Sequence, residues 1–335
     1  MLSNPTRLTP YYHPTTVLII DDDRGLVDSV TLSLSDDFIC LAHGHPGEAL
    51  AHIQHSRNVY ASERACALAF PNGRRADRNA GLSERPTFLD LADMPRIMTN
   101  DNRFGEISVA IVDYDLPYMH GIDFCSLLKN TQIKTILLTA KASGDTALEA
   151  FNDNVIDMFL RKQDPEVLNK LAAGVATLQG QYIQDKCYSN TSVIDMSTLD
   201  EKGLDFLFDE HFIDYFRTVY EGGGVVEYYY SIDPKGLQIV GADGQLRMML
   251  VCHRRDLKGH GGAAPPLGDG LQVPWSRAGQ SAPPEAWFAA KPVGDWLCAV
   301  VDRGAFPSAI DAPQESLHTF RDRDQDWRSA PDLIA

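Results

Sequence analysis

Five short apolar segments, each followed by a stretch that suits a helix, constrain the fold of this 335-residue chain more than any other feature. Several are rich in β-branched residues, and fully apolar runs of this length are typical of strands buried on both faces. Strands that alternate with helices form a parallel sheet covered by helices on both sides. We therefore predict an α/β fold with strands at 15–20, 38–42, 107–112, 135–138 and 156–160.

Helices are expected between these strands. Apolar residues recur at helical spacing in the intervening segments, and a longer apolar repeat starts after the last strand. The predicted helices cover 24–36, 46–55, 121–129 and 145–152, and the longer one begins at Pro165.

Polar residues follow four of the predicted strands at the point where each strand ends. Asp21 and Asp22 follow the first strand, Asp113 the third, Thr139 the fourth and Lys162 the fifth. The ligand site of such a sheet lies beyond the carboxyl ends of its strands. Clustered carboxylates raise one another's pKa unless a cation lies between them, and with carbonyls and waters they suit Mg²⁺. A lysine and a hydroxyl opposite the metal could hold the other oxygens of a phosphoryl group during its transfer to a carboxylate.

Four stretches of the chain resemble the receiver domain of bacterial two-component response regulators. They are VLIIDDD (17–23), AIVDYDLPYMHGIDF (110–124), LLTAKAS (137–143) and MFLRKQDP (158–165). The resemblance implies a flavodoxin-like, doubly wound, five-stranded parallel sheet. It also implies a phosphorelay reaction, in which a histidine kinase or phosphotransfer protein donates a phosphoryl group to one aspartate in the presence of Mg²⁺.

The same resemblance implies roles for the acidic residues. Asp113 is the expected phosphoacceptor. Asp22 and Asp113 are expected to bind Mg²⁺ through their side chains, Asp21 through a bound water and Asp115 through its backbone carbonyl. The expected cofactor is therefore Mg²⁺.

Three further roles and two departures follow from the resemblance. Thr139 is the expected switch hydroxyl, Lys162 the residue that contacts the phosphate, and Phe159 the switch aromatic. The family usually has a proline after this lysine, whereas Gln163 stands here, so the loop could have a different path. An insertion at 56–100 separates the second helix from the third strand.

The insertion is rich in arginine. A long loop within a domain is either functional or a solvated excursion, and an arginine cluster could bind phosphate, nucleotide or an acidic partner. Both interpretations stay open. Six arginines lie within 56–85, namely Arg57, Arg64, Arg74, Arg75, Arg78 and Arg85.

The helix that begins at Pro165 carries an apolar stripe with the spacing of a coiled-coil seam. The stripe is compatible with a homodimer through 165–185, or with packing against the chain's own C-terminal domain, and Gly174 interrupts it. The stripe consists of Leu168, Leu171, Val175, Leu178 and Tyr182.

The C-terminal half has an α+β pattern. Apolar residues between Leu204 and Val219 predict an amphipathic helix that ends at Gly222–Gly224. Turn residues separate the next strands, which predicts an antiparallel meander. Strands are predicted at 225–231, 237–240, 246–251 and 296–301, with a loop over 259–284.

These patterns divide the chain into domains. We predict a receiver over 14–180 that contains the insertion, a linker helix over 165–188, and an α+β output or interaction domain over 189–335.

Charge and motifs exclude several classes of partner. A net charge of −16 argues against DNA or an anionic membrane as the main partner, and there is no helix-turn-helix with a basic second helix. No apolar run has the length of a membrane span and the N-terminus has no apolar signal-peptide core, so a cytoplasmic location is expected. The six cysteines include no C-x-x-C pair, which argues against zinc.

Together these features predict a signalling phosphoprotein. Its C-terminal domain is expected to bind a downstream protein, with no enzymatic activity beyond phosphorylation and autodephosphorylation of the receiver. The alternative is a phosphatase, cyclase or hydrolase in the C-terminal domain that the receiver controls.

Overall fold

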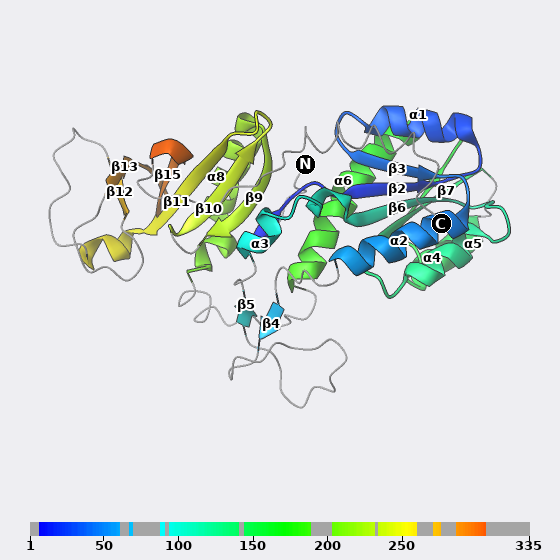
Figure 1. Cartoon of the computed structure of the whole chain (residues 1–335), viewed down its shortest axis with the longest axis horizontal. Coiled ribbons are helices and arrows are strands. Elements are labelled where there is room, and N and C mark those ends of the chain that lie inside the picture. The colour runs from blue at the N-terminus through cyan, green and yellow to red at the C-terminus, as the bar shows by residue number, and fades with distance from the viewer. Residues whose placement is uncertain are drawn as a thin grey trace. The chain divides into compact units, whose positions relative to one another are not determined.

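The computed structural model describes residues 7–60, 67–69, 88–90, 94–140, 144–188, 203–231, 234–259, 271–275 and 286–305 (Figure 1). The chain divides into two units, each assembled from separate stretches of sequence. The first unit contains Pro14–Arg64 and Asn102–Ser189 together with Met1–Ser3. The second contains Asn4–His13, Ala65–Asp101 and Asn190–Ala335.

A parallel five-stranded sheet forms the centre of the first unit. Its strands are β2 (Thr16–Ile20), β3 (Ile39–His43), β6 (Ile107–Asp113), β7 (Lys134–Thr139) and β8 (Met158–Arg161). They lie in the order β3-β2-β6-β7-β8, and every residue of the central strand β6 is buried. This arrangement confirms the predicted doubly wound, flavodoxin-like sheet.

Helices cover both faces of this sheet, as the fully apolar strands require. They are α1 (Arg24–Leu34), α2 (Pro46–Tyr60), α4 (Gly121–Leu128), α5 (Gly144–Asn152) and α6 (Val167–Tyr188). Helices α1 and α6 share one apolar core with the sheet, and α2, α4 and α5 lie on the opposite face (Figure 1).

The apolar stripe of α6 packs within the first unit itself. Leu171, Val175 and Leu178 are buried in the core that α6 forms with α1 and the sheet. These side chains are therefore core residues of the first unit, and a homodimer through 165–185 stays a prediction. A close contact explains the glycine at position 174, because a Cβ there would lie 2.7 Å from Met158 Sδ on β8.

Polar contacts fix the second half of α6 to the amino end of the sheet. Tyr182 Oη donates to Glu106 Oε1 at 2.7 Å, and Lys186 Nζ forms an ion pair with the same carboxylate oxygen. The Glu106 side chain is only 10% exposed. One turn earlier, Gln179 Nε2 donates to the backbone oxygen of Thr15 at 2.9 Å, just before β2.

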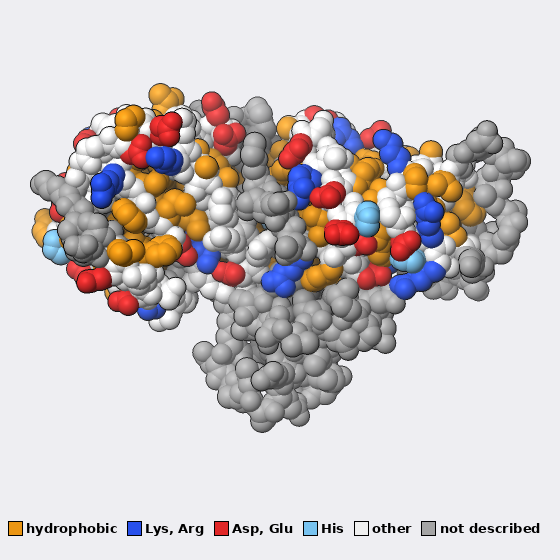
Figure 2. Space-filling view, turned by 180° about the vertical axis from the view of Figure 1, so that it is seen from behind, with side chains coloured by type: hydrophobic (Ala, Val, Ile, Leu, Met, Phe, Trp, Pro, Cys, Tyr) orange, Lys and Arg blue, Asp and Glu red, His pale blue; other side chains and the backbone are white. Residues whose placement is uncertain are grey.

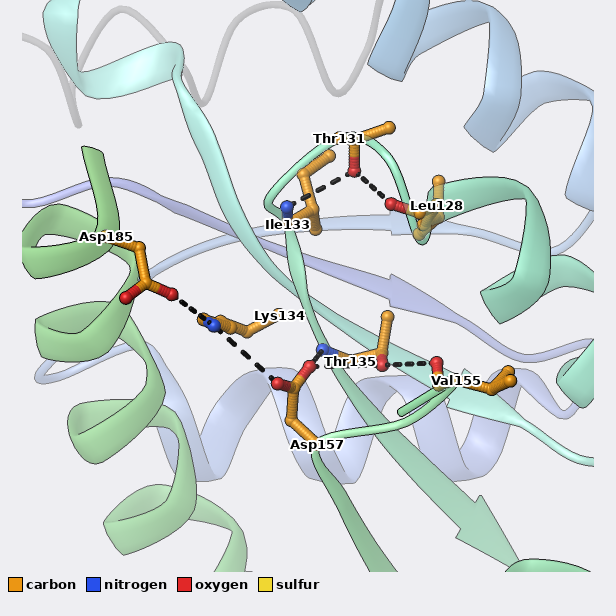
Figure 3. Close-up of polar contacts among 8 residues, drawn as sticks. All are labelled: Leu128, Thr131, Ile133, Lys134, Thr135, Val155, Asp157 and Asp185. Carbon is orange, nitrogen blue, oxygen red and sulfur yellow. Dashed lines mark hydrogen bonds and ion pairs between the residues drawn. The ribbon is translucent and has the colours of Figure 1, made fainter. Parts of the chain in front are cut away.

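A second group of charges lies at the start of β7 (Figure 3). Lys134 Nζ donates to Asp185 Oδ2 of α6 at 2.6 Å and lies 3.7 Å from Asp157 Oδ1. Asp157 Oδ2 in turn accepts the Thr135 backbone N–H at 2.8 Å. The end of α6 is therefore attached by charge to the sheet at a second point.

The second unit is built on an antiparallel six-stranded sheet. Its strands are β1 (Tyr11–Tyr12), β9 (Val225–Ser231), β10 (Gly236–Gly241), β11 (Leu246–His253), β14 (Lys291–Val293) and β15 (Trp296–Asp302). They lie in the order β1-β9-β10-β11-β15-β14. The predicted meander corresponds to β9, β10 and β11. Helix α8 (Glu210–Gly223) ends at Gly224, whose φ of 59° is the left-handed cap that the glycine run predicted.

An N-terminal segment completes this sheet, which the sequence did not reveal. Tyr11 and Tyr12 pair with Tyr229 and Tyr228 of β9, and Tyr230 N–H donates to the Pro10 carbonyl at 2.7 Å. Part of the insertion also belongs to this unit, since helix α3 (Met94–Met98) lies against β9. The domain boundaries remain a prediction, but these two stretches extend the second unit beyond 189–335.

Smaller elements complete the described chain. The predicted loop over 259–284 contains a strand, so that expectation is wrong for residues 272–275. Val273 of this strand is buried against Met248 and Leu250. The elements are β4 (Ala67–Ala69) paired with β5 (Phe88–Asp90), β12 (Gln272–Trp275) paired with β13 (Ala286–Ala289), and the 3₁₀ turns Arg103–Gly105, Asp205–Phe208, Arg254–Gly259 and Arg303–Ala305.

The contacts of Glu106 predict a specific stability effect. Glu106→Ala deprives the largely buried Lys186 of its carboxylate and should lower the free energy of unfolding by about 2–4 kcal/mol. Chemical denaturation followed by circular dichroism measures this change. Lys170→Ala at the exposed start of α6 is the control and should leave the midpoint nearly unchanged. Equal effects of the two substitutions would contradict this account of α6.

Candidate functional site at the carboxyl edge of the parallel sheet

Three carboxylates meet at the carboxyl edge of the first sheet. Asp21 directly follows β2, and Asp113 is the last residue of the neighbouring strand β6. One oxygen each from Asp21, Asp22 and Asp113 lies within 4.8 Å of the others. Asp21 and Asp113 are only 4% and 6% exposed, whereas Asp22 is open to solvent. The sequence-predicted cluster is thus assembled by the fold.

Lys162 bridges the two buried acids. Its Nζ lies 2.7 Å from Asp21 Oδ2 and 2.8 Å from Asp113 Oδ1. Lys162 follows β8, which is separated from β6 by β7, so the long side chain reaches across the end of an intervening strand. One ammonium therefore serves two carboxylates.

Burial and charge shift the pKa values of this group. Burial raises the pKa of Asp21, and the charge of Asp113 adds to the rise, while hydrogen bonds from Lys162 and from the Asp23 N–H oppose it. Burial alone would lower the pKa of Lys162, but its hydrogen bonds and ion pairs with Asp113 and Asp21 outweigh that effect and raise it. Lys162 therefore stays charged at neutral pH.

The donor set fits a hard divalent cation. Three carboxyl groups and one ammonium meet at this partly buried site, so acidic groups outnumber the cation among the described residues that form it. Carboxylate oxygens are the ligands that Mg²⁺ prefers, and the exposed Asp22 gives access from solvent. No nitrogen or sulfur ligand belongs to the group, so the site suits Mg²⁺ better than a softer metal.

The third aspartate of the Asp21–Asp22–Asp23 run has a different task. Asp23 is the N-cap of α1, and its Oδ1 accepts the N–H groups of Gly25 at 3.0 Å and Leu26 at 3.3 Å. Its own N–H donates to Asp21 Oδ1 at 2.9 Å. The cap thereby fixes the start of the helix and orients the buried acid.

The loop after Asp113 turns tightly. Gly121 N–H donates to the Tyr114 carbonyl at 2.8 Å, and a Cβ on Gly121 would lie 2.1 Å from the Asp113 carbonyl oxygen. The residue must therefore be glycine. Asp115 lies exposed in this loop, and its side chain is not in the group of three carboxylates.

The remaining predicted residues lie on β7 and β8. Thr139 ends β7 and is buried, and its carbonyl accepts the Lys162 N–H at 2.8 Å. Phe159 pairs with Leu137, and the side chains that flank it in β8 pack into the α1–α6 core, so Phe159 faces the other side of the sheet. Gln163 Nε2 donates to the Ala140 carbonyl at 2.7 Å, a contact that the sequence analysis did not anticipate.

Comparison with known proteins supports the architecture. No family profile matches the chain, and no curated protein matches it. The structure resembles that of the Legionella pneumophila response regulator LqsR, with 24% identity and a TM-score of 0.67 over 94% of this chain and 95% of LqsR. The chain has the fold of a response regulator. This likeness spans both units of the protein.

Two isolated receiver domains also match. The receiver domain of the Francisella response regulator 1452 is 16% identical with a TM-score of 0.31, over 50% of this chain and 98% of that domain. A CheY-like receiver domain protein from Methanospirillum hungatei is 16% identical with a TM-score of 0.31, over 52% of this chain and 96% of that protein.

The described part of the second unit contains no evident DNA-binding domain. Its three adjacent tyrosines, Tyr228, Tyr229 and Tyr230, are buried within the sheet packing rather than displayed on a surface. On the face shown in Figure 2, acidic and basic side chains of the described residues are interspersed in each unit and form no continuous basic patch.

Two further expectations concern membranes and the insertion. Among the described helices, none combines the length and the apolar character needed to cross a bilayer. Of the six arginines within 56–85, Arg57 lies in α2 and the other five fall outside the described residues.

Gly121 provides a test of the site's geometry. Gly121→Ala places a methyl group against the Asp113 carbonyl and should lower the free energy of unfolding by about 2–4 kcal/mol. Gly180→Ala in α6 is the matched control, because nothing lies within 4 Å of its added Cβ. It should raise the stability by about 0.5–1 kcal/mol. Urea denaturation of both variants measures the difference, and a Gly121→Ala protein as stable as wild type would refute this tight turn.

Proposed function

We propose that this protein is a two-component response regulator that accepts a phosphoryl group on Asp113 from a histidine kinase or phosphotransfer protein. The observation that carries the proposal is Lys162, whose ammonium contacts both Asp113 and Asp21 at the carboxyl edge of the sheet. A lysine so placed can neutralise phosphoryl oxygens beside the acceptor. We place this reaction in the cytoplasm.

The chemistry is a transfer between two protein side chains. A carboxylate oxygen of Asp113 attacks phosphorus, a P–O bond forms, and the P–N bond to the donor histidine breaks. Lys162 moves from its ion pairs to the incoming oxygens, and the Thr139 hydroxyl donates to another of them. The product is an acyl phosphate on Asp113.

Mg²⁺ is the cofactor that we assign to this reaction. Asp22 and Asp113 would hold it through carboxylate oxygens, Asp21 through a bound water and Asp115 through its backbone carbonyl. The bound ion would offset the negative charge that accumulates between acceptor and phosphoryl group.

The output follows from movement at the same edge. Thr139 moves toward the phosphoryl oxygens and Phe159 turns, which changes the surface formed by β7, α5 and β8. Helix α6 begins a few residues after Lys162, and the chain then leads into the second unit. We propose that this unit acts by binding a downstream protein. Its described part has no evident DNA-binding domain, and the net charge of −16 disfavours nucleic acid.

Intact mass after incubation with acetyl phosphate tests the proposal. Wild type should gain the mass of one phosphoryl group when Mg²⁺ is present and none when EDTA replaces it. Asp113→Ala should gain none, while Asp123→Ala, which removes an exposed acid of α4, should behave as wild type.

Two outcomes would contradict the assignment. One is an adduct of equal yield on Asp113→Ala. The other is a folded wild-type protein that gains no adduct from acetyl phosphate or phosphoramidate in saturating Mg²⁺.

A further inference from the structure

A side-chain hydrogen bond joins the residues that follow Thr139 and Lys162. Gln163 Nε2 donates to the backbone oxygen of Ala140 at 2.7 Å. Because the acceptor is a carbonyl, only the amide nitrogen of this side chain can face it. The contact therefore requires glutamine's terminal amide, not merely a side chain of its length.

The bond continues the strand pairing beyond the end of the sheet. The last backbone contact between these two segments runs from the Lys162 N–H to the Thr139 carbonyl at 2.8 Å. Gln163 and Ala140 are the next residues of the two segments. Their side-chain-to-backbone hydrogen bond therefore extends the contact between the segments by one residue. Each partner adjoins a residue proposed to contact the phosphoryl group.

Hydrogen bonds and an ion pair also fix the backbone on either side of Gln163. Asp164 N–H donates to the Arg161 carbonyl at 3.0 Å, which closes a turn around Lys162 and Gln163. Asp164 Oδ1 accepts the Glu166 N–H at 2.9 Å, and Asp164 Oδ2 pairs with Lys170 Nζ at 2.6 Å. The start of α6 therefore anchors one end of the bridge, and the other end is the loop after β7.

We propose that Gln163 is a positioning residue for phosphoryl transfer, which sets the spacing between the Lys162 ammonium and the Thr139 hydroxyl. This inference rests on the proposed function of the site. A proline at this position would restrict the loop through its ring, because proline fixes φ. Gln163 restricts it through a hydrogen bond to Ala140, so the constraint links the residue after the lysine to the residue after the switch threonine.

The rate of adduct formation in saturating Mg²⁺ tests the role of Gln163. Gln163→Leu keeps the bulk but has no donor, and it should form the acetyl phosphate adduct about three- to tenfold more slowly than wild type. Gln163→Asn keeps the amide on a side chain one methylene shorter and should also be slow. Gln54→Leu, an exposed glutamine of α2, is the matched control and should match wild type.

Mg²⁺ affinity separates positioning from a general structural effect. Calorimetric titration with Mg²⁺ in the absence of phosphodonor should give the same Kd for wild type, Gln163→Leu and Gln163→Asn. The bond lies outside the three carboxylates, so its loss should leave them in place.

The outcomes distinguish this inference from the proposed function. A wild-type protein without adduct would refute the proposed function itself. A wild-type adduct with unchanged rates in both Gln163 variants would overturn only the role of Gln163. Slower rates with an equally weakened Mg²⁺ affinity would also overturn it, since the substitution would then act through the acid cluster.

Discussion

The ion pairs of Lys162 with Asp21 and Asp113 are the interaction on which the site depends. They join residues from the ends of β2, β6 and β8, and each partner is largely removed from water. Buried charges of this kind are costly unless they are paired. The parallel sheet brings the three strand ends to one edge, and the ammonium offsets part of the carboxylate charge. The same ammonium is then available for the oxygens of an incoming phosphoryl group.

At the opposite, amino edge of the sheet, a second set of charged side chains attaches helix α6 to the sheet. Glu106 holds the second half of α6 through Lys186 and Tyr182, and Lys134 of β7 adds a link to Asp185. Helix α6 thus begins a few residues after Lys162, and these polar contacts hold its C-terminal half before the chain enters the second unit. The N-terminal strand β1 belongs to the second unit and precedes β2 by only a few residues. The chain therefore passes between the two units before β2 and after α6, and again at both ends of Ala65–Asp101.

Local patterns sufficed to predict the five strands of the parallel sheet, the β9–β11 meander, most helices and the polar residues at the strand ends, because each depends on residues close together in sequence. The apolar run before Asp21 and the glycines after α8 are such signals. The features that the sequence did not predict depend on contacts between residues far apart in sequence. The stripe that contains Leu171 and Leu178 has the same spacing whether it faces a partner or its own sheet. Strand β1 has two residues and exists only because β9 offers an edge. Nothing near Gln163 in sequence indicates its bond to Ala140.

The measurement that tests the central claim most directly is fluorine NMR of the protein with beryllium, fluoride and Mg²⁺. Beryllium trifluoride bonds to a carboxylate oxygen and has the shape and charge of a phosphoryl group. The account predicts bound fluorine resonances for wild type that are absent from Asp113→Ala, because Lys162 and the acid cluster surround that one acceptor. Bound resonances of equal intensity in Asp113→Ala, or none in folded wild type, would contradict a phosphoacceptor site at this edge of the sheet.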